Sequence, residues 1–338
     1  MWPLLKWINQ HLVLAIPAMM LLGFGFGLAT EPFFLKRLIV PLTFLMVYPM
    51  MVTLKIKQVF QGGDIRAQLL TQLINFGIIP FVAFGAGLIF LQERPYMALG
   101  LLLAGLVPTS GMTISWTGLA RGNMAAAVKM TVIGLTLGSL ATPLYVQALL
   151  GARIAVDMGA VIHQIALIVF LPMAAVFVAQ QLLIRKVGQK RFQKEIGPRF
   201  PGIATIGVLG IVFVAMALKA QAIASAPQLL VTIMAPLLLV YAVNYIISTL
   251  TGRFFLPRGD AIALVYGSVM RNLSIALALA INAFGERGAD AALVVAMAYI
   301  IQVQSAAWYV KHTDRIFGVR PDENTSRGKP PGLPEVAR

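Results

Sequence analysis

Apolar runs of about 20 residues recur along nearly the whole chain, the length that a helix needs to cross a hydrocarbon core about 30 Å thick. Strands of a membrane barrel would alternate polar and apolar residues, and these runs do not alternate. The sequence therefore predicts an all-α integral membrane protein. Ten transmembrane helices are expected, at 11–29, 39–54, 68–91, 97–119, 124–150, 160–184, 203–219, 228–250, 261–284 and 289–309.

The composition agrees with this class. Only 12% of the residues are charged, whereas a soluble domain has about 25%. The net charge of +15 is explained by cytoplasmic loops rich in Lys and Arg, so nucleic acid is not an expected partner. The chain contains no Cys, which excludes disulfides, thiolate metal sites and cysteine nucleophiles. No cofactor and no metal site is expected.

Basic residues predict the orientation. An even number of spans places both termini on one side, and the loops of that side hold most of the Lys and Arg residues, which indicates the cytoplasm. Residues 1–10 are read as an amphipathic lead without a cleaved signal peptide. Residues 321–338 are rich in Pro, Gly and charge and are predicted to form a disordered cytoplasmic tail. The expected location is the cell membrane, as a multi-pass protein.

Prolines suggest an internal repeat. Pro17 and Pro80, in the first and third spans, lie at nearly the same offset from Pro172 and Pro236, in the sixth and eighth spans. Five spans are an odd number, so a second copy would enter from the opposite face, as in the inverted repeats of many secondary transporters. The two predicted repeats cover 11–150 and 160–309.

Two spans carry signs of a broken helix. In the fourth span, Pro108 removes a backbone donor and crowds the preceding turn, and Gly111 follows it. In the ninth span, Gly267 is the expected break point. Interrupted helices in the two halves of a transporter indicate a substrate site near the bilayer midplane. The polar side chains near these breaks are candidate substrate ligands: Thr109, Ser110, Thr113, Ser268, Arg271, Asn272 and Ser274.

Two cations lie deep inside apolar spans, Lys129 and Arg271, and no acid lies equally deep to pair with them. A charge in hydrocarbon is costly and is normally paired or turned toward a water-lined path. Arg271 is far from both ends of its span and suits bidentate recognition of an oxyanion. Lys129 either binds the same anion or extends its ammonium group to the membrane interface.

Neutral amides also occur in the spans. Asn75 is a further candidate substrate ligand. The amides of the third and tenth spans either line a pathway or bond between helices: Gln68, Gln72, Gln302 and Gln304.

Five segments resemble the bile acid/sodium symporter superfamily, and particularly its arsenite-efflux permease branch. The resemblance runs from Leu12 to Tyr309 and is carried by residues 47–50, 75–80, 108–123, 183–186 and 276–285. It implies ten spans in inverted five-helix repeats, with helices four and nine discontinuous and crossing at the binding site.

The chain departs from these relatives at the ligands. Arsenite permeases have a cysteine after the fourth-span proline, where this chain has Thr109, and a carboxylate near Ser274. Sodium-coupled relatives have a glutamate and a glutamine near Gly267 and Arg271. Both the thiol for trivalent arsenic and the carboxylate for ion coupling are therefore absent.

These observations favour a secondary transporter that moves a small organic anion or oxyanion by alternating access, without the usual sodium sites. One alternative is an arsenite or antimonite efflux permease that uses hydroxyls in place of the cysteine. Another is a sodium-coupled organic anion symporter. An enzyme is not expected, because the spans lack acid/base pairs. The expected partners are the lipid bilayer and a small anionic solute. The sequence leaves open whether the chain forms a homo-oligomer.

Overall fold

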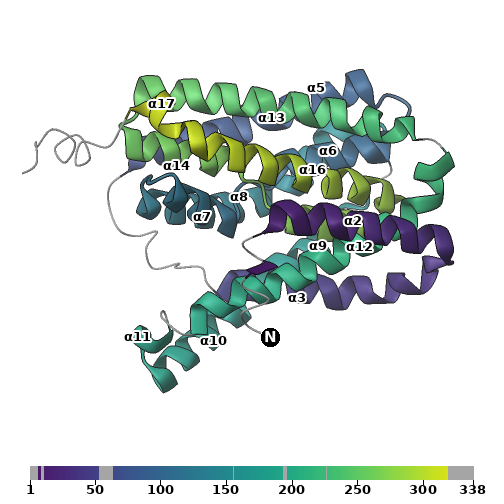
Figure 1. Ribbon diagram of the computed structural model, residues 1–338, viewed down its shortest axis with the longest axis horizontal. Coiled ribbons are helices and arrows are strands. Elements are labelled where there is room, and N and C mark those ends of the chain that lie inside the picture. The colour runs from purple at the N-terminus through teal and green to yellow at the C-terminus, as the bar shows by residue number, and fades with distance from the viewer. Residues whose placement is uncertain are drawn as a thin grey trace, which may run out of the picture.

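The computed structural model of this protein describes residues 7–8, 11–52, 64–154, 156–192, 196–225 and 227–318. Within these residues every regular element is a helix (Figure 1). The expected tail at 321–338 and most of the expected lead at 1–10 lie outside the described residues.

The first half contains α2 (Leu12–Ala29), η1 (Pro32–Leu38), α3 (Ile39–Val52), α4 (Ile65–Gln72), η3 (Leu73–Ile78), α5 (Ile79–Phe90), α6 (Pro95–Leu106), α7 (Gly111–Leu119) and α8 (Met124–Leu150). The second half contains α9 (Met158–Ile165), η4 (Ala166–Phe170), α10 (Leu171–Val187), α11 (Gln189–Arg191), η6 (Gly197–Arg199), α12 (Phe200–Ser225), α13 (Gln228–Phe255), α14 (Arg258–Val269), α15 (Leu273–Ala283), η7 (Gly285–Arg287), α16 (Gly288–Tyr309), η8 (Val310–His312) and α17 (Thr313–Phe317).

Six helices of the described chain are long and apolar enough to cross a membrane, and α6 with α7 forms a seventh candidate that bends by 57° at its break. The six are Ile65–Phe90, Met124–Leu150, Gly202–Ser225, Gln228–Phe255, Arg258–Ala283 and Gly288–Phe317. Most helix bounds agree with the expected ranges to within a few residues. The clearest difference is α12, which continues past 219 to Ser225, because Lys219 pairs with Asp290 of α16 at 2.7 Å instead of ending the helix.

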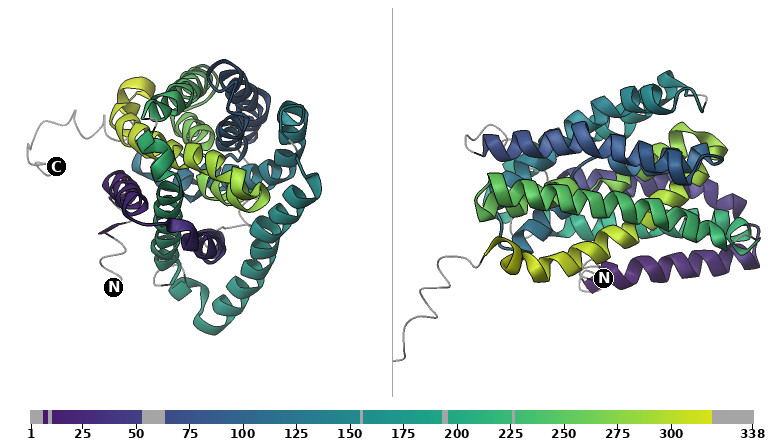
Figure 2. Two further views of the ribbon diagram at one scale, coloured as in Figure 1. Left: turned by 90° about the vertical axis from the view of Figure 1, so that its right-hand side faces the viewer. Right: turned by 90° about the horizontal axis from the view of Figure 1, so that it is seen from above.

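The helices pack in two groups. In one group, α12 packs along α2 and α3, and α10 packs on α3 and extends with α11 away from the bundle (Figures 1 and 2). In the other, α13 packs on α14 and α5, and α16 packs on α6 and α15. The interrupted helices α6–α7 and α14–α15 both belong to this second group. Residues Arg258–Ala283 are its most enclosed span, and within it residues 261–280 are all buried.

The prolines do not share local structure in the expected pairs. The π-helical segments η3 and η4 directly precede the turns that contain Pro80 and Pro172. A widened turn accommodates a residue that lacks a backbone donor. Pro17 and Pro236 instead lie inside the α-helices α2 and α13.

Candidate functional site

The first break separates α6 from α7 and confirms the discontinuity predicted at Pro108. Thr109 has φ of 62°, a left-handed conformation that is uncommon for a β-branched residue. Its Oγ1 donates to the carbonyl of Thr131 at 3.1 Å, which fastens the break to α8. Ser110 then caps α7: its Oγ accepts from the Met112 amide, while Thr113 Oγ1 accepts from the Ser110 amide. The three predicted hydroxyl ligands therefore also shape the break, and Gly111 is the first residue of α7.

The second break lies at residues 270–272, between α14 and α15, and not at Gly267 as the sequence predicted. Gly267 belongs to the last turn of α14. A Cβ atom there would lie 2.8 Å from Met130 Sδ and 3.2 Å from Thr71 Cγ2, so this glycine permits close packing on α8 and α4. The helix restarts because Asn272 acts as the N-cap of α15, with its Oδ1 accepting from the Ile275 amide at 3.2 Å.

Two helical hydrogen bonds are missing at this break. In a continuous helix the Arg271 and Asn272 amides would donate to the carbonyls of Gly267 and Ser268, four residues earlier. Those carbonyls instead accept from side chains of neighbouring helices. Asn75 Nδ2 donates to Gly267 at 3.1 Å and Asn244 Nδ2 donates to Ser268 at 3.0 Å.

The released amides find other acceptors. The Asn272 amide donates to the Val107 carbonyl in the first break at 2.8 Å, so the two breaks touch. The Arg271 amide donates to Gln302 Oε1 of α16 at 2.9 Å, and Gln302 Nε2 donates back to the Arg271 carbonyl at 3.1 Å. Tyr241 Oη also donates to Gln302 Oε1, at 2.8 Å. Side chains from three helices thus replace the bonds that the break removes.

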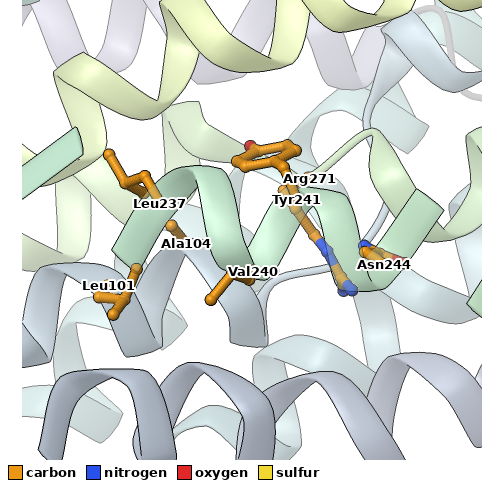
Figure 3. A pocket seen from close by; sticks show the side chains of 7 residues that line it. All are labelled: Leu101, Ala104, Leu237, Val240, Tyr241, Asn244 and Arg271. Atoms are coloured by element: carbon orange, nitrogen blue, oxygen red, sulfur yellow. The ribbon is translucent and has the colours of Figure 1, made fainter. Parts of the chain in front are cut away.

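The Arg271 side chain is the main charged group at this point. It is 2% exposed, and its Nη1 and Nη2 atoms have no hydrogen-bond partner within the described chain. It lines a small cavity between α6 and α13 (Figure 3). The other lining residues are Leu101, Ala104, Leu237, Val240, Tyr241 and Asn244. A buried cation with unfilled donors is suited to bind an anion.

Lys129 has an acid partner, so the prediction that it lacks one is wrong. Its Nζ lies 3.1 Å from Asp64 Oδ2, and the lysine is 4% exposed. The helix that was expected to begin at 68 begins at Ile65, which brings Asp64 to the N-cap position of α4, facing α8. Asn123 Nδ2 donates to Asp64 at 3.2 Å and to Asp260 at 2.7 Å, which extends the network to α14.

Replacing Asp64 by Asn is expected to destabilise the protein more than replacing Lys129 by Met. The first change removes the negative charge that lies 3.1 Å from a buried ammonium, whereas the second leaves a carboxylate that is 18% exposed and reaches water. The expected cost of Asp64→Asn is about 1–3 kcal/mol. Thermal unfolding of the two single variants and the double variant measures the coupling. Additive effects would show that the pair contributes nothing.

The remaining predicted ligands divide into two sets. In the first set, Ser268 Oγ, Asn272 Nδ2 and Asn75 Oδ1 are buried and have no hydrogen-bond partner within the described chain. Ser268 and Asn272 are also close to Arg271 in the sequence. Ser274 Oγ instead shares a hydrogen bond of 2.7 Å with Tyr299 Oη, which ties α15 to α16.

The sequence did not predict Asn244 and Tyr241 as site residues. For Gln302 it left open whether the side chain lines a pathway or bonds between helices. Tyr241, Asn244 and Ser248 are buried at helical spacing in α13. A polar stripe of this kind inside an apolar span is the signal that could have identified them.

The family described as Sodium Bile acid symporter family matches residues 40–226 of this chain. The arsenical-resistance protein Acr3 of Alkaliphilus metalliredigens is 24% identical over 290 residues, which cover 81% of this chain and 80% of the relative. The uncharacterized sodium-dependent transporter YocS of Bacillus subtilis is 26% identical over 212 residues, with coverage of 62% and 63%. The probable sodium/metabolite cotransporter BASS1 of Arabidopsis thaliana is 30% identical over 140 residues, with coverage of 41% and 33%. These matches are to transporters and not to enzymes.

Proposed function

This chain belongs to the sodium bile acid symporter family, and from this premise we propose that it is a secondary transporter that moves a small anionic solute by alternating access. Arg271 carries the proposal, because its guanidinium is buried at a helix break with two donor atoms that no described residue fills. A buried ion is stable only when it is paired and hydrogen-bonded. A bound anion supplies both.

In this proposal Arg271 binds the charge of the solute, and Asn272 Nδ2 and Ser268 Oγ supply further hydrogen bonds at the break. Thr109, Ser110, Thr113, Asn75 and Ser274 shape the two breaks around it. The architecture that goes with this function is ten spans in two inverted repeats, with both termini in the cytoplasm.

We further propose that transport is independent of sodium. The guanidinium of Arg271 carries a fixed positive charge at the second break. Two like charges a few Å apart repel strongly in a protein interior, so this charge disfavours a sodium ion bound nearby. The sodium-coupled organic anion symporter is the outcome that would contradict this part of the proposal.

Arsenite or antimonite efflux is the second candidate, favoured by the similarity to the arsenical-resistance protein Acr3. It ranks second on chemical grounds. The chain has no cysteine, and the hydroxyls of Thr109, Ser110 and Thr113 are hard ligands for a thiophilic metalloid.

A thermal-shift screen of the purified protein separates these functions. We expect small carboxylates or oxyanions to raise the melting temperature, and the shift to be the same in sodium and in choline buffers. Stabilisation by arsenite alone, matched by greater metalloid sensitivity of cells that lack the gene, would instead support the second candidate. A shift that appears only with sodium would refute sodium independence.

A further inference from the structure

The orientation of the Asn244 side chain is fixed by its neighbour. Its Nδ2 donates to the Ser268 carbonyl at 3.0 Å, and a carbonyl oxygen can only accept. The other end of the amide, Oδ1, is therefore a free acceptor. Asn244 is 2% exposed, and Oδ1 has no hydrogen-bond partner within the described chain.

Asn244 lies on the cavity that Arg271 also lines. Both residues line it, Asn244 from α13 and Arg271 from the break (Figure 3). The residues that line the cavity therefore carry unfilled donors, Nη1 and Nη2 of Arg271, together with an unfilled acceptor, Oδ1 of Asn244. A ligand that bonds only to the donors, or only to the acceptor, leaves a buried polar atom without a hydrogen-bond partner.

The rest of the lining limits the body of the ligand. Leu101 and Ala104 of α6 and Leu237 and Val240 of α13 are apolar, and they offer no second cation. A single positive charge matches a single negative charge, and these walls suit a short carbon skeleton or a compact oxyanion.

We infer that this cavity selects small monoanions that carry a hydrogen-bond donor of their own, either a hydroxycarboxylate or a protonated oxyanion. The inference rests on the proposed function of Arg271 as the anion ligand. The anionic oxygens accept from Arg271, and the hydroxyl of the solute donates to Asn244 Oδ1. An anion without a hydroxyl pairs with Arg271 but leaves the buried acceptor Asn244 Oδ1 without a hydrogen-bond donor. Sites that hydrogen-bond a ligand hydroxyl reject analogues that lack it.

Two matched pairs of probes test this selectivity. Glycolate is compared with acetate for the carboxylate class, and phosphate with methanesulfonate at pH 6 for the tetrahedral oxyanion class, by calorimetric titration of the purified protein at constant ionic strength. Both members of each pair are then mainly monoanions, and they differ in the hydroxyl. We expect the hydroxyl-bearing partner to bind at least about tenfold more tightly in one pair or in both. The pair that shows the preference identifies the class of solute.

A variant tests the role of the acceptor. Asn244→Leu is expected to reduce the preference for the hydroxyl-bearing probe to about onefold. Asn282→Leu on α15 is the matched control, because Asn282 Nδ2 donates to the Ala278 carbonyl of its own helix. This control should retain the preference. If Asn244→Leu does not fold, the inference is tested by the affinity ratios that the unaltered protein shows within the two probe pairs. Equal binding within both pairs would overturn the inference and leave the anion site standing. Absence of binding for all four probes would count against the anion site as well.

Discussion

Replacing Arg271 by Met is expected to abolish anion binding and to raise the melting temperature of the ligand-free protein. The guanidinium is 2% exposed, and Nη1 and Nη2 have no partner within the described chain. Removing a buried, unpaired charge relieves a desolvation penalty of several kcal/mol. Each charged hydrogen bond to a ligand contributes about 1.5–3 kcal/mol, so the loss of two weakens binding by roughly 100-fold or more.

The opposite signs of these two effects are diagnostic. Removing a residue whose role is structural would lower both stability and binding. Removing a functional residue that is held at a cost to stability should raise the stability of the ligand-free protein and lower its affinity for the anion. Thermal unfolding without ligand and titration with the best probe of the screen measure the two quantities. A fall in the melting temperature of Arg271→Met would contradict the proposed role.

Arg258 offers a matched control for the same substitution. Its guanidinium pairs with Asp314 and donates to the carbonyls of Gly318 at 2.7 Å and Arg121 at 3.1 Å. Arg258→Met should therefore lower the melting temperature and leave anion affinity unchanged. Arg271→Lys is an intermediate case, because it keeps the charge but loses the planar fork, and should bind anions about tenfold more weakly.

The sequence predicted the helix ranges and the first break well because their causes are local. Apolar length determines where a membrane helix can run, and Pro108 cannot continue a helix. The second break has no such local cause. Its hydrogen bonds come from Asn75, Asn244 and Gln302, which lie far away in the chain, so its position at 270–272 follows from tertiary contacts.

The two buried cations show the same limit. Arg271 lies in the middle of an apolar span, and its lack of an acid partner could be predicted by inspecting the sequence. The partner of Lys129 could not, because Asp64 reaches it only through the N-terminal start of α4 and its packing against α8. Charges inside spans are therefore easier to interpret than charges near the ends of helices.

Gln302 provides the second large expected effect. Its side chain makes hydrogen bonds to both the amide and the carbonyl of Arg271 and accepts another from Tyr241. Gln302→Met leaves the Arg271 carbonyl without this donor, and leaves the amide with only its 3.0 Å contact to the Val269 carbonyl. The Arg271 carbonyl and the Tyr241 hydroxyl both lose this partner. Each buried polar group left unpaired costs about 1–3 kcal/mol, so we expect destabilisation of about 2–6 kcal/mol.

Hydrogen exchange distinguishes a local role of Gln302 at the break from a general loss of packing. If Gln302 holds the break, Gln302→Met should speed exchange of the amides at 270–272 more than that of α8, where Ala127 and Leu135 are fully buried. Gln221→Met, an exposed glutamine on α12, is the matched control and should change neither exchange nor stability. Uniform acceleration across all helices would show that Gln302 supports the bundle as a whole. Protection unchanged at 270–272 would show that Asn75, Asn244 and the Val107 carbonyl hold the break without it.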